Sequence, residues 1–458
     1  MMKSRIFRSG ELLVVLVLGC LAGYACGGSV RNNGDSRNDR DSRNDRDSLP
    51  PVETKSPNSD YKPAFAGQTR IAGVKTNTPY TVEKIAESLG HPFAIVAMPD
   101  GRLMVTIKSG YMEIRDRNGA LVRKITGFPA VVYAGQGGLL DVAFDPKFTT
   151  NKIFYWCYSE AYSGENLTAV AKGKLNEAEG KVEDVTVIFR ATPGTGSTLQ
   201  YGSRLVFDRQ GYLLVSVGEK FMPQSRVEAQ NVDSYLGKIV RITTDGKPAP
   251  GNPFLHQSGA KPEVYSYGHR NPEGLDIDPA TGELWESEFG PRGGDEINII
   301  RPGKNYGWPV ITYGIEYQGG PVGAGIQQKA GMEQPVYYWD PVISPSGICF
   351  YRGGGSGGSG SGGGGGSGGG TGSGGSGGGG GRTGGGSGSG GIPEWKDNLF
   401  IACLSGQHLD RVVIRNNKVV GEERLLEDKH QRMRDVTYLD NMLFVITDDG
   451  DIYKIAKK

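Results

Sequence analysis

The stretch Met98-Pro99-Asp100-Gly101-Arg102-Leu103-Met104-Val105 decides the fold, because it joins a turn to the start of an alternating strand. Pro, Asp and Gly are turn residues, and apolar residues at every second position are typical of a strand with one buried face. The same pattern of turn and strand recurs at residues 144–155, 207–215, 277–285, 393–401 and 438–446. Six such hairpins, with no strong amphipathic helix between them, predict an all-β protein with the fold of a six-bladed β-propeller. The alternative, a β-sandwich with extra hairpins, explains the recurrence less well.

The composition excludes two classes of protein. The 458 residues contain 51 Lys and Arg against 50 Asp and Glu, which gives a formal net charge of +1. A nucleic-acid-binding protein would show a basic excess, so we expect no nucleic acid among the partners. Of the five cysteines, Cys20 and Cys26 lie near the N-terminus, and the remaining three are too few for a disulfide scaffold.

Residues 1–26 have the features of an export signal with a lipobox-like cysteine. Basic residues precede a short apolar run that begins at residues 12–18 and is too short for an ordinary transmembrane helix. Val17-Leu18-Gly19-Cys20 resembles a bacterial lipobox, and Gly23-Tyr24-Ala25-Cys26 is a poorer match. We therefore expect an exported lipoprotein, periplasmic or at the outer membrane or cell surface, that contacts the membrane only through its lipid anchor. The alternative is a cleaved signal peptide with incidental cysteines.

A disordered polar linker is predicted at residues 27–67, and the propeller at 68–458. Within the linker, the unit at 35–40 recurs at 41–46, and the region offers little apolar surface to bury.

An insertion rich in Gly and Ser interrupts the propeller at residues 353–391. It holds 28 glycines in 39 positions, so it cannot bury a core and is predicted to be a flexible coil. Cys349 and Cys403 flank it on what should be neighbouring strands of one blade. Export would permit a disulfide between them, and two buried free thiols are equally consistent with the sequence.

Polar runs lie at predicted strand ends, where the loops of a propeller gather round its central channel. Arg270, Arg432 and Arg434 carry planar groups that pair with carboxylates through two hydrogen bonds. Gln136 and Asn271 can form hydrogen bonds with ring carbonyls. This set suits an anionic, planar ligand, although each residue alone also has a purely structural interpretation.

A candidate metal site lies at Glu288, Gly290 and Pro291. Their carboxylate and carbonyl oxygens, with Asp295 and Glu296 close by in sequence, are of the ligand type that Ca²⁺ prefers. The structural alternative is that the two acidic residues at 295 and 296 cap a turn.

These motifs resemble those of the soluble PQQ-dependent glucose dehydrogenases, and especially of the bacterial aldose sugar dehydrogenases. The resemblance runs from about Glu83 to the C-terminus, apart from the insertion. It rests on Tyr-Gly-His-Arg-Asn-Pro at 267–272, Gly-Pro-Arg-Gly-Gly-Asp-Glu-Ile-Asn at 290–298 and Asn-Tyr-Gly-Trp-Pro at 305–309. The family fold is a six-bladed propeller, in agreement with the number of hairpins.

The resemblance implies a role for each candidate that would bind PQQ. Gln136 matches a glutamine that contacts PQQ. Arg270 and Asn271 match a pair that binds the quinone, with the arginine polarising the reactive carbonyl. Arg432 and Arg434 match arginines that pair with the carboxylates of PQQ.

The resemblance also implies a calcium ion and an activity. The backbone oxygens of Gly290 and Pro291 match ligands of the calcium that holds PQQ, with Glu288 beside them. Glu219 matches an acidic residue near the catalytic base. The implied reaction is oxidation of an aldose at C1 to a lactone, with hydride transfer to PQQ and electrons passed to an external acceptor. Whether the chain forms a homodimer is left open.

One departure from the family concerns the general base. The family has a histidine where this chain has Gln200, and a glutamine amide cannot accept a proton at useful pH. Three interpretations follow. In the first, Glu219 serves as the base, and in the second, the enzyme acts on another substrate. In the third, the chain is a non-catalytic sugar- or ligand-binding propeller.

Overall fold

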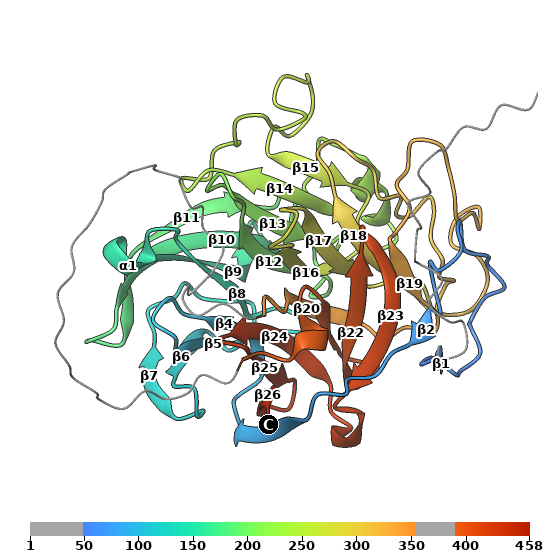
Figure 1. Cartoon of the computed structure of the whole chain (residues 1–458). Coiled ribbons are helices and arrows are strands. Elements are labelled where there is room, and N and C mark those ends of the chain that lie inside the picture. The colour runs from blue at the N-terminus through green and yellow to red at the C-terminus, as the bar shows by residue number, and fades with distance from the viewer. Residues whose placement is uncertain (1–48, 354–389) are drawn as a thin grey trace, which may run out of the picture. The chain divides into compact units, whose positions relative to one another are not determined.

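The computed structural model describes residues 49–353 and 390–458, and most regular structure in these ranges is β-strand. The strands form six sheets arranged round a common centre (Figure 1). Each sheet is one blade, and neighbouring strands within the blades are antiparallel except where β2 joins β23. The predicted six-bladed β-propeller is therefore confirmed.

The first three blades follow one another along the chain. Blade 1 contains β4 (Pro92–Ala97), β5 (Leu103–Ile107), β6 (Tyr111–Arg115) and β7 (Leu121–Ile125). Blade 2 contains β8 (Leu139–Phe144), β9 (Ile153–Tyr162), β10 (Glu165–Asn176) and β11 (Lys181–Arg190). Blade 3 contains β12 (Gly202–Phe207), β13 (Leu213–Val217), β14 (Lys238–Ile242) and β15 (Val264–Tyr267).

Blade 4 is also continuous along the chain, whereas blades 5 and 6 include strands from the N-terminal part of the described chain. Blade 4 contains β16 (Pro272–Ile277), β17 (Leu284–Glu288), β18 (Asp295–Ile300) and β19 (Tyr337–Trp339). Blade 5 contains β20 (Pro345–Phe350), β21 (Leu399–Cys403), β22 (His408–Arg415) and β23 (Lys418–Leu425), extended by β2 (Ala72–Gly73) and β1 (Leu49–Pro51). Blade 6 contains β24 (Met433–Leu439), β25 (Met442–Thr447), β26 (Ile452–Lys457) and β3 (Tyr80–Ala86).

Helical structure in the described ranges is short. It consists of α1 (Phe148–Asn151) and the 3₁₀ turns η1 (Arg226–Gln230), η2 (Pro393–Trp395) and η3 (Glu427–Lys429). No helix in these ranges is long and apolar enough to cross a membrane.

Each predicted hairpin joins the first and second strands of one blade, so the sequence pattern marked every blade once. The first strands β4, β8, β12, β16, β20 and β24 contact one another in ring order. They line a central cavity of about 150 Å³. The closing strand β3 pairs with β26 and thereby joins the N-terminal part of the propeller to its last blade.

Aspartates on the first strands connect neighbouring blades at this centre. In alternate blades, a carboxylate on the first strand accepts a hydrogen bond from a backbone N–H on the first strand of the next blade. The length of each of these hydrogen bonds is 2.8 Å. The pairs are Asp141 with Leu205, Asp276 with Phe350 and Asp435 with Ile95. Arg204 Nη1 lies 3.1 Å from Asp435 and 3.5 Å from Asp141, so one buried cation links two of these carboxylates.

Cys349 and Cys403 lie on β20 and β21, which are paired as expected. Both are buried free thiols, so the interpretation as a disulfide is wrong. Most of the insertion lies outside the described residues.

The predicted linker differs from the structure in its last part. Residues 49–67 pack on the propeller: β1 pairs with β2, and Asn58 and Ser59 donate backbone N–H groups to the Asp340 carboxylate. Glu53 also pairs with Arg424 at 2.9 Å. Low apolar content did not exclude order here because polar contacts fix the segment. The predicted signal segment and the repeat at 35–46 lie outside the described residues.

Replacing Arg204 with Met tests the central ion pairs. The loss of the guanidinium leaves two buried carboxylates without their cation, so the free energy of unfolding should fall by about 3–5 kcal/mol in urea denaturation. The control Arg123→Met, on the exposed part of β7, should change it by less than about 0.5 kcal/mol. A loss as small as that of the control would contradict a role for Arg204 in joining the blades.

Candidate active site

The predicted site residues lie in loops at one end of the propeller. In each blade the first strand begins, and the antiparallel second strand ends, at the same end. Residues that precede a first strand therefore meet residues that follow a second strand. The set before or at the start of a first strand comprises Gln136, Gln200, Arg270, Asn271, Arg432 and Arg434, and the set after a second strand comprises Glu219, Gly290 and Pro291.

Gln136 and Gln200 are in direct contact. Gln136 Oε1 accepts a hydrogen bond of 2.6 Å from the backbone N–H of Gln200. Gln200 has a positive φ of 50°, which turns its carbonyl toward Gly218, where a Cβ would come within 2.3 Å of that oxygen. Gln200 Oε1 is buried and has no hydrogen-bond partner among the described residues. The position of the family base is thus fixed by its backbone, and the end of its side chain is unpaired.

Asn271 connects this pair to the arginines. Its Oδ1 accepts from the backbone N–H of Gly202 at 3.0 Å, and its Nδ2 donates to Glu273 Oε1 at 3.0 Å. The other oxygen of Glu273 accepts from Arg434 Nη1 at 3.0 Å. Asn271 is fully buried, and both polar atoms of its side chain form hydrogen bonds within the protein.

Arg432 and Arg434 share one acid. Their Nε atoms pair with the two oxygens of Asp448, at 2.8 Å and 2.6 Å. The Arg434 side chain is largely buried, whereas that of Arg432 is 46% exposed. Arg432 can therefore present the end of its guanidinium group to a ligand from solvent.

The Glu219 carboxylate is buried and has one unpaired oxygen. Its Oε2 accepts from the backbone N–H of Phe221 at 3.0 Å and from Ser225 Oγ at 3.1 Å, whereas Oε1 has no partner among the described residues. Burial raises the pKa of Glu219, and the positive charge of Arg270 partly opposes that rise. The backbone N–H of Glu219 donates to the carbonyl of Arg270 at 2.9 Å, which brings these two predicted residues together.

Arg270 is buried among carbonyl groups and aromatic rings. Its Nη1 donates to the carbonyls of Phe289 and Gly290 at 2.9 Å and 2.7 Å, and its Nη2 donates to the Tyr317 hydroxyl at 3.1 Å. Its Nε has no partner among the described residues. The structure thus places Arg270 next to one of the two carbonyls predicted to bind calcium.

Asp295 holds the turn that carries Gly290 and Pro291. Its Oδ1 accepts from the N–H of Gly290 at 2.7 Å, and its Oδ2 accepts from the N–H groups of Ile343 and Ser344 at 2.7 Å and 2.6 Å. Burial raises the pKa of Asp295 to about 7. The motif acid therefore orients the turn through backbone contacts. The predicted alternative of a turn-capping acid agrees with this geometry for Asp295.

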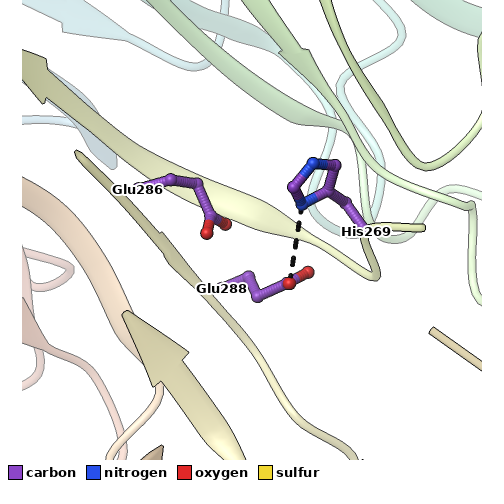
Figure 2. A group of neighbouring side chains, drawn as sticks. All are labelled: His269, Glu286 and Glu288. Carbon is purple, nitrogen blue, oxygen red and sulfur yellow. Dashed lines mark ion pairs between the residues drawn. The ribbon is translucent and has the colours of Figure 1, made fainter. Parts of the chain in front are cut away.

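Glu288 points into a buried acidic cluster together with Glu286 and His269 (Figure 2). His269 Nδ1 lies 3.6 Å from Glu288 Oε1, and Glu288 Oε2 accepts from the N–H of Arg270 at 2.5 Å. Asn298 Nδ2 donates to Glu286 Oε2 at 3.1 Å, while Glu286 Oε1 and Asn298 Oδ1 have no partner among the described residues. Burial and the nearby carboxylate of Glu288 raise the pKa values of Glu286 and Glu296 well above the ordinary value. The cluster holds more acceptor groups than donors.

Three aromatic residues near Arg270 were not predicted from the sequence. Its guanidinium lies 5.8 Å from the Phe221 ring centroid and 5.2 Å from that of Trp308, and Phe221 and Tyr317 pack edge to face at 5.8 Å. Trp308 belongs to the quoted Asn-Tyr-Gly-Trp-Pro run, which was a usable signal. Nothing local in the sequence marks Phe221 or Tyr317.

Lys220 was also missed. Its Nζ donates to Asn166 Oδ1 at 3.0 Å and lies 3.1 Å from the centroid of the Tyr201 ring. Burial lowers the pKa of Lys220 to about 6. Because Tyr201 follows Gln200 and Lys220 follows Glu219, this contact joins the segment that carries Gln200 to the segment that carries Glu219.

The comparisons with known proteins agree with this geometry. The model of the family described as Glucose / Sorbosone dehydrogenase matches residues 89–357 and 387–454. Aldose sugar dehydrogenase YliI of Escherichia coli is 36% identical over 383 residues, which cover 82% of this chain and 93% of that protein. The crystal structure of the soluble aldose sugar dehydrogenase from Escherichia coli in the apo-form superposes with a TM-score of 0.71 at 36% identity, over 83% of this chain and 100% of that chain.

A more distant structure shares the fold. It is the PQQ-bound form of aldose sugar dehydrogenase from Streptomyces coelicolor, with a TM-score of 0.63 at 24% identity over 83% of this chain and 99% of that chain. The family match covers more than half of the chain, and it spans the loops that carry Gln136, Gln200, Arg270 and Gly290. This chain belongs to the glucose/sorbosone dehydrogenase family.

Proposed function

We propose that this chain oxidises an aldose at C1 with bound PQQ and Ca²⁺, gives a lactone, and passes the electrons to an external acceptor. One observation carries the proposal: Gln136, Gln200, Arg270 and Asn271 meet at one end of the channel. Glu219 is bonded to the same loops. Family membership and the names of the relatives support the same class of reaction.

The residues present fit a planar, polar cofactor. Gln200 Oε1, Glu219 Oε1 and Arg270 Nε are buried without partners among the described residues, although buried polar atoms are nearly always paired. Gln136, Arg270, Asn271, Arg432 and Arg434 are the residues that would hold PQQ. A structural relative of lower identity has PQQ bound, which supports this choice.

The acidic cluster supports a bound cation beside this site. Three buried carboxylates lie together, with acceptor atoms of Glu286 and Asn298 unpaired, and no Lys or Arg is among the main causes of the shifted pKa values of Glu286 and Glu296. Buried charges are normally paired or bind metals. Glu288, with the carbonyls of Gly290 and Pro291, would supply oxygen ligands of the type that Ca²⁺ prefers.

In the proposed reaction the protein positions the sugar and accepts its proton. When bound, PQQ would supply the two-electron acceptor for the hydride from C1, and calcium would supply positive charge beside it. Glu219 Oε1 accepts the proton of the C1 hydroxyl, because it is the unpaired oxygen of a buried carboxylate with a raised pKa. The positive charge of Arg270 stabilises the negative charge that develops during the reaction.

A non-catalytic binding propeller is the second candidate. Gln200 favours it, because losing a general base typically lowers the rate by about 10² to 10⁴. Both candidate functions use the same ligand site, but only the dehydrogenase would turn over a sugar substrate.

The chain's location and partners extend the proposal. We propose that residues 1–26 direct export and that Cys20 is lipidated, which would place the site in the periplasm or at a membrane surface. A lipid label in growing cells should enter the unmodified chain and disappear from Cys20→Ser. Labelling that persists in Cys20→Ser but is lost in Cys26→Ser would move the anchor to Cys26.

Glu219→Gln tests the base. The purified protein with PQQ and Ca²⁺ should reduce a dye in the presence of aldoses, and Glu219→Gln should lower kcat by about 10² to 10⁴. Because the carboxylate must be ionised, kcat/KM should rise with pH through a pKa above about 4.3, the ordinary value for Glu. Glu219→Gln should lose this limb of the profile, and the exposed control Glu179→Gln should keep it. Turnover by Gln200→His alone would identify the natural protein as a binder.

Calcium should stabilise the folded protein without any substrate. Positive charge in the acidic cluster relieves repulsion among buried carboxylates, so added Ca²⁺ should raise Tm and chelation should lower it. Glu288→Gln should reduce this shift, whereas Glu87→Gln, at an exposed surface position, should leave it unchanged. If Ca²⁺ shifts Tm equally in the unmodified protein, Glu288→Gln and Glu87→Gln, the ion binds elsewhere.

A further inference from the structure

Lys108 lies at the site end of the propeller, although no motif marked it. It follows β5, the second strand of blade 1, and is half-buried. Its backbone carbonyl accepts from the N–H of Leu139 at 2.9 Å, and its own N–H donates to the carbonyl of His91 at 3.1 Å. Its Nζ donates to the carbonyl of Gly135 at 3.1 Å, next to Gln136. Two hydrogen bonds thus tie Lys108 to the loop that carries a predicted cofactor contact.

The Lys108 ammonium group lies among charged side chains of the site. The charged groups that act on it are Arg434, Asp448 and Glu273, and burial followed by Arg434 lowers its pKa. Asp448 already pairs with both Arg432 and Arg434, and Glu273 with Arg434. Both carboxylates near Lys108 are therefore already paired with arginines.

The Lys108 ammonium group donates fewer hydrogen bonds within the protein than it can. An ammonium group has three N–H donors, and the structure gives it one hydrogen-bond acceptor among the described residues, the carbonyl of Gly135. The Tyr133 ring, 6.0 Å away, is a weak further contact. A half-buried cation with donors to spare, close enough to Arg434 for their charges to interact, makes a site that favours an anion.

We propose that Lys108 binds a carboxylate of the planar polyanionic cofactor, together with Arg432 and Arg434. This inference rests on the proposed function and adds a binding residue from blade 1 to the site. The carboxylate would complete the hydrogen bonding of the ammonium group, because the two protein carboxylates near it are already paired with arginines. Lys108 is in this role a cofactor-binding residue with no part in proton transfer.

Titration of the full chain with PQQ in the absence of sugar tests the inference. Binding is followed by tryptophan fluorescence and by the absorbance of PQQ, with calcium held constant. Lys108→Met should raise Kd by about 10- to 100-fold, as expected for the loss of a hydrogen bond between charged groups. Lys108→Gln, which keeps a donor for Gly135, should show the same loss, and Lys108→Arg should stay within about threefold of the unmodified protein.

Controls separate loss of charge from loss of folding. Lys147→Met removes the same charge from an exposed loop after β8, at the other end of the blades, and should leave Kd unchanged. Near-ultraviolet circular dichroism should be the same for all variants. The salt dependence of Kd should be weaker in Lys108→Met and Lys108→Gln than in the unmodified protein, because one ionic contact is missing.

The outcomes distinguish the inference from the proposed function. If Lys108→Met and Lys108→Gln bind PQQ as tightly as the unmodified protein, the role of Lys108 is wrong and the cofactor proposal stands. If the unmodified protein takes up no PQQ, both the inference and the proposed cofactor are wrong.

Discussion

The hydrogen bonds that aspartates on the first strands accept from the next blade are the constraint on which the rest of the structure depends. A propeller has few covalent connections between blades, so the distance between neighbouring first strands must be set by contacts. Asp141, Asp276 and Asp435 do this by accepting a backbone N–H from the following blade. An aspartate is suited to the task because its second oxygen remains available to a further partner. At Asp141 that partner is Arg204, which also lies 3.1 Å from the Asp435 oxygen that accepts from Ile95.

The site follows from the same arrangement at the start of the first strands. Once adjacent blades are fixed, the loops before β8, β12, β16 and β24 converge, and residues from different blades come within hydrogen-bond distance. Glu273 shows the connection directly, because its carboxylate contacts Asn271 and Arg434 while its carbonyl accepts from Arg204. The cofactor-binding candidates are thus attached to the same network that joins the blades. A substitution in that network is expected to act on stability and on the site together.

Much of the fold could be predicted from the sequence because its signals are local. Turn residues beside alternating strands marked one hairpin in each blade, and no long-range information was needed. The pairing of β3 with β26 and the ordering of residues 49–67 could not be predicted, since both depend on contacts between distant segments. Motif residues such as Arg270 and Asn271 were found because they lie in long specific runs. Lys108 and Tyr317 were missed because only the fold brings them to the site.

The loop geometry at Gln200, where the resemblance implies a histidine base, is set by backbone contacts. Its backbone N–H is held by Gln136 and its carbonyl packs on Gly218, so the loop geometry does not depend on the identity of the side chain. A histidine can therefore be lost there without disturbing the ligand site. Proton transfer, in contrast, needs a titratable group. Within this set of loops, Glu219 has an unpaired oxygen, and burial raises its pKa toward the range where a carboxylate is a better base. Retained binding geometry with a displaced base is consistent with an enzyme whose proton acceptor has moved by one loop, from the segment before β12 to the segment after β13.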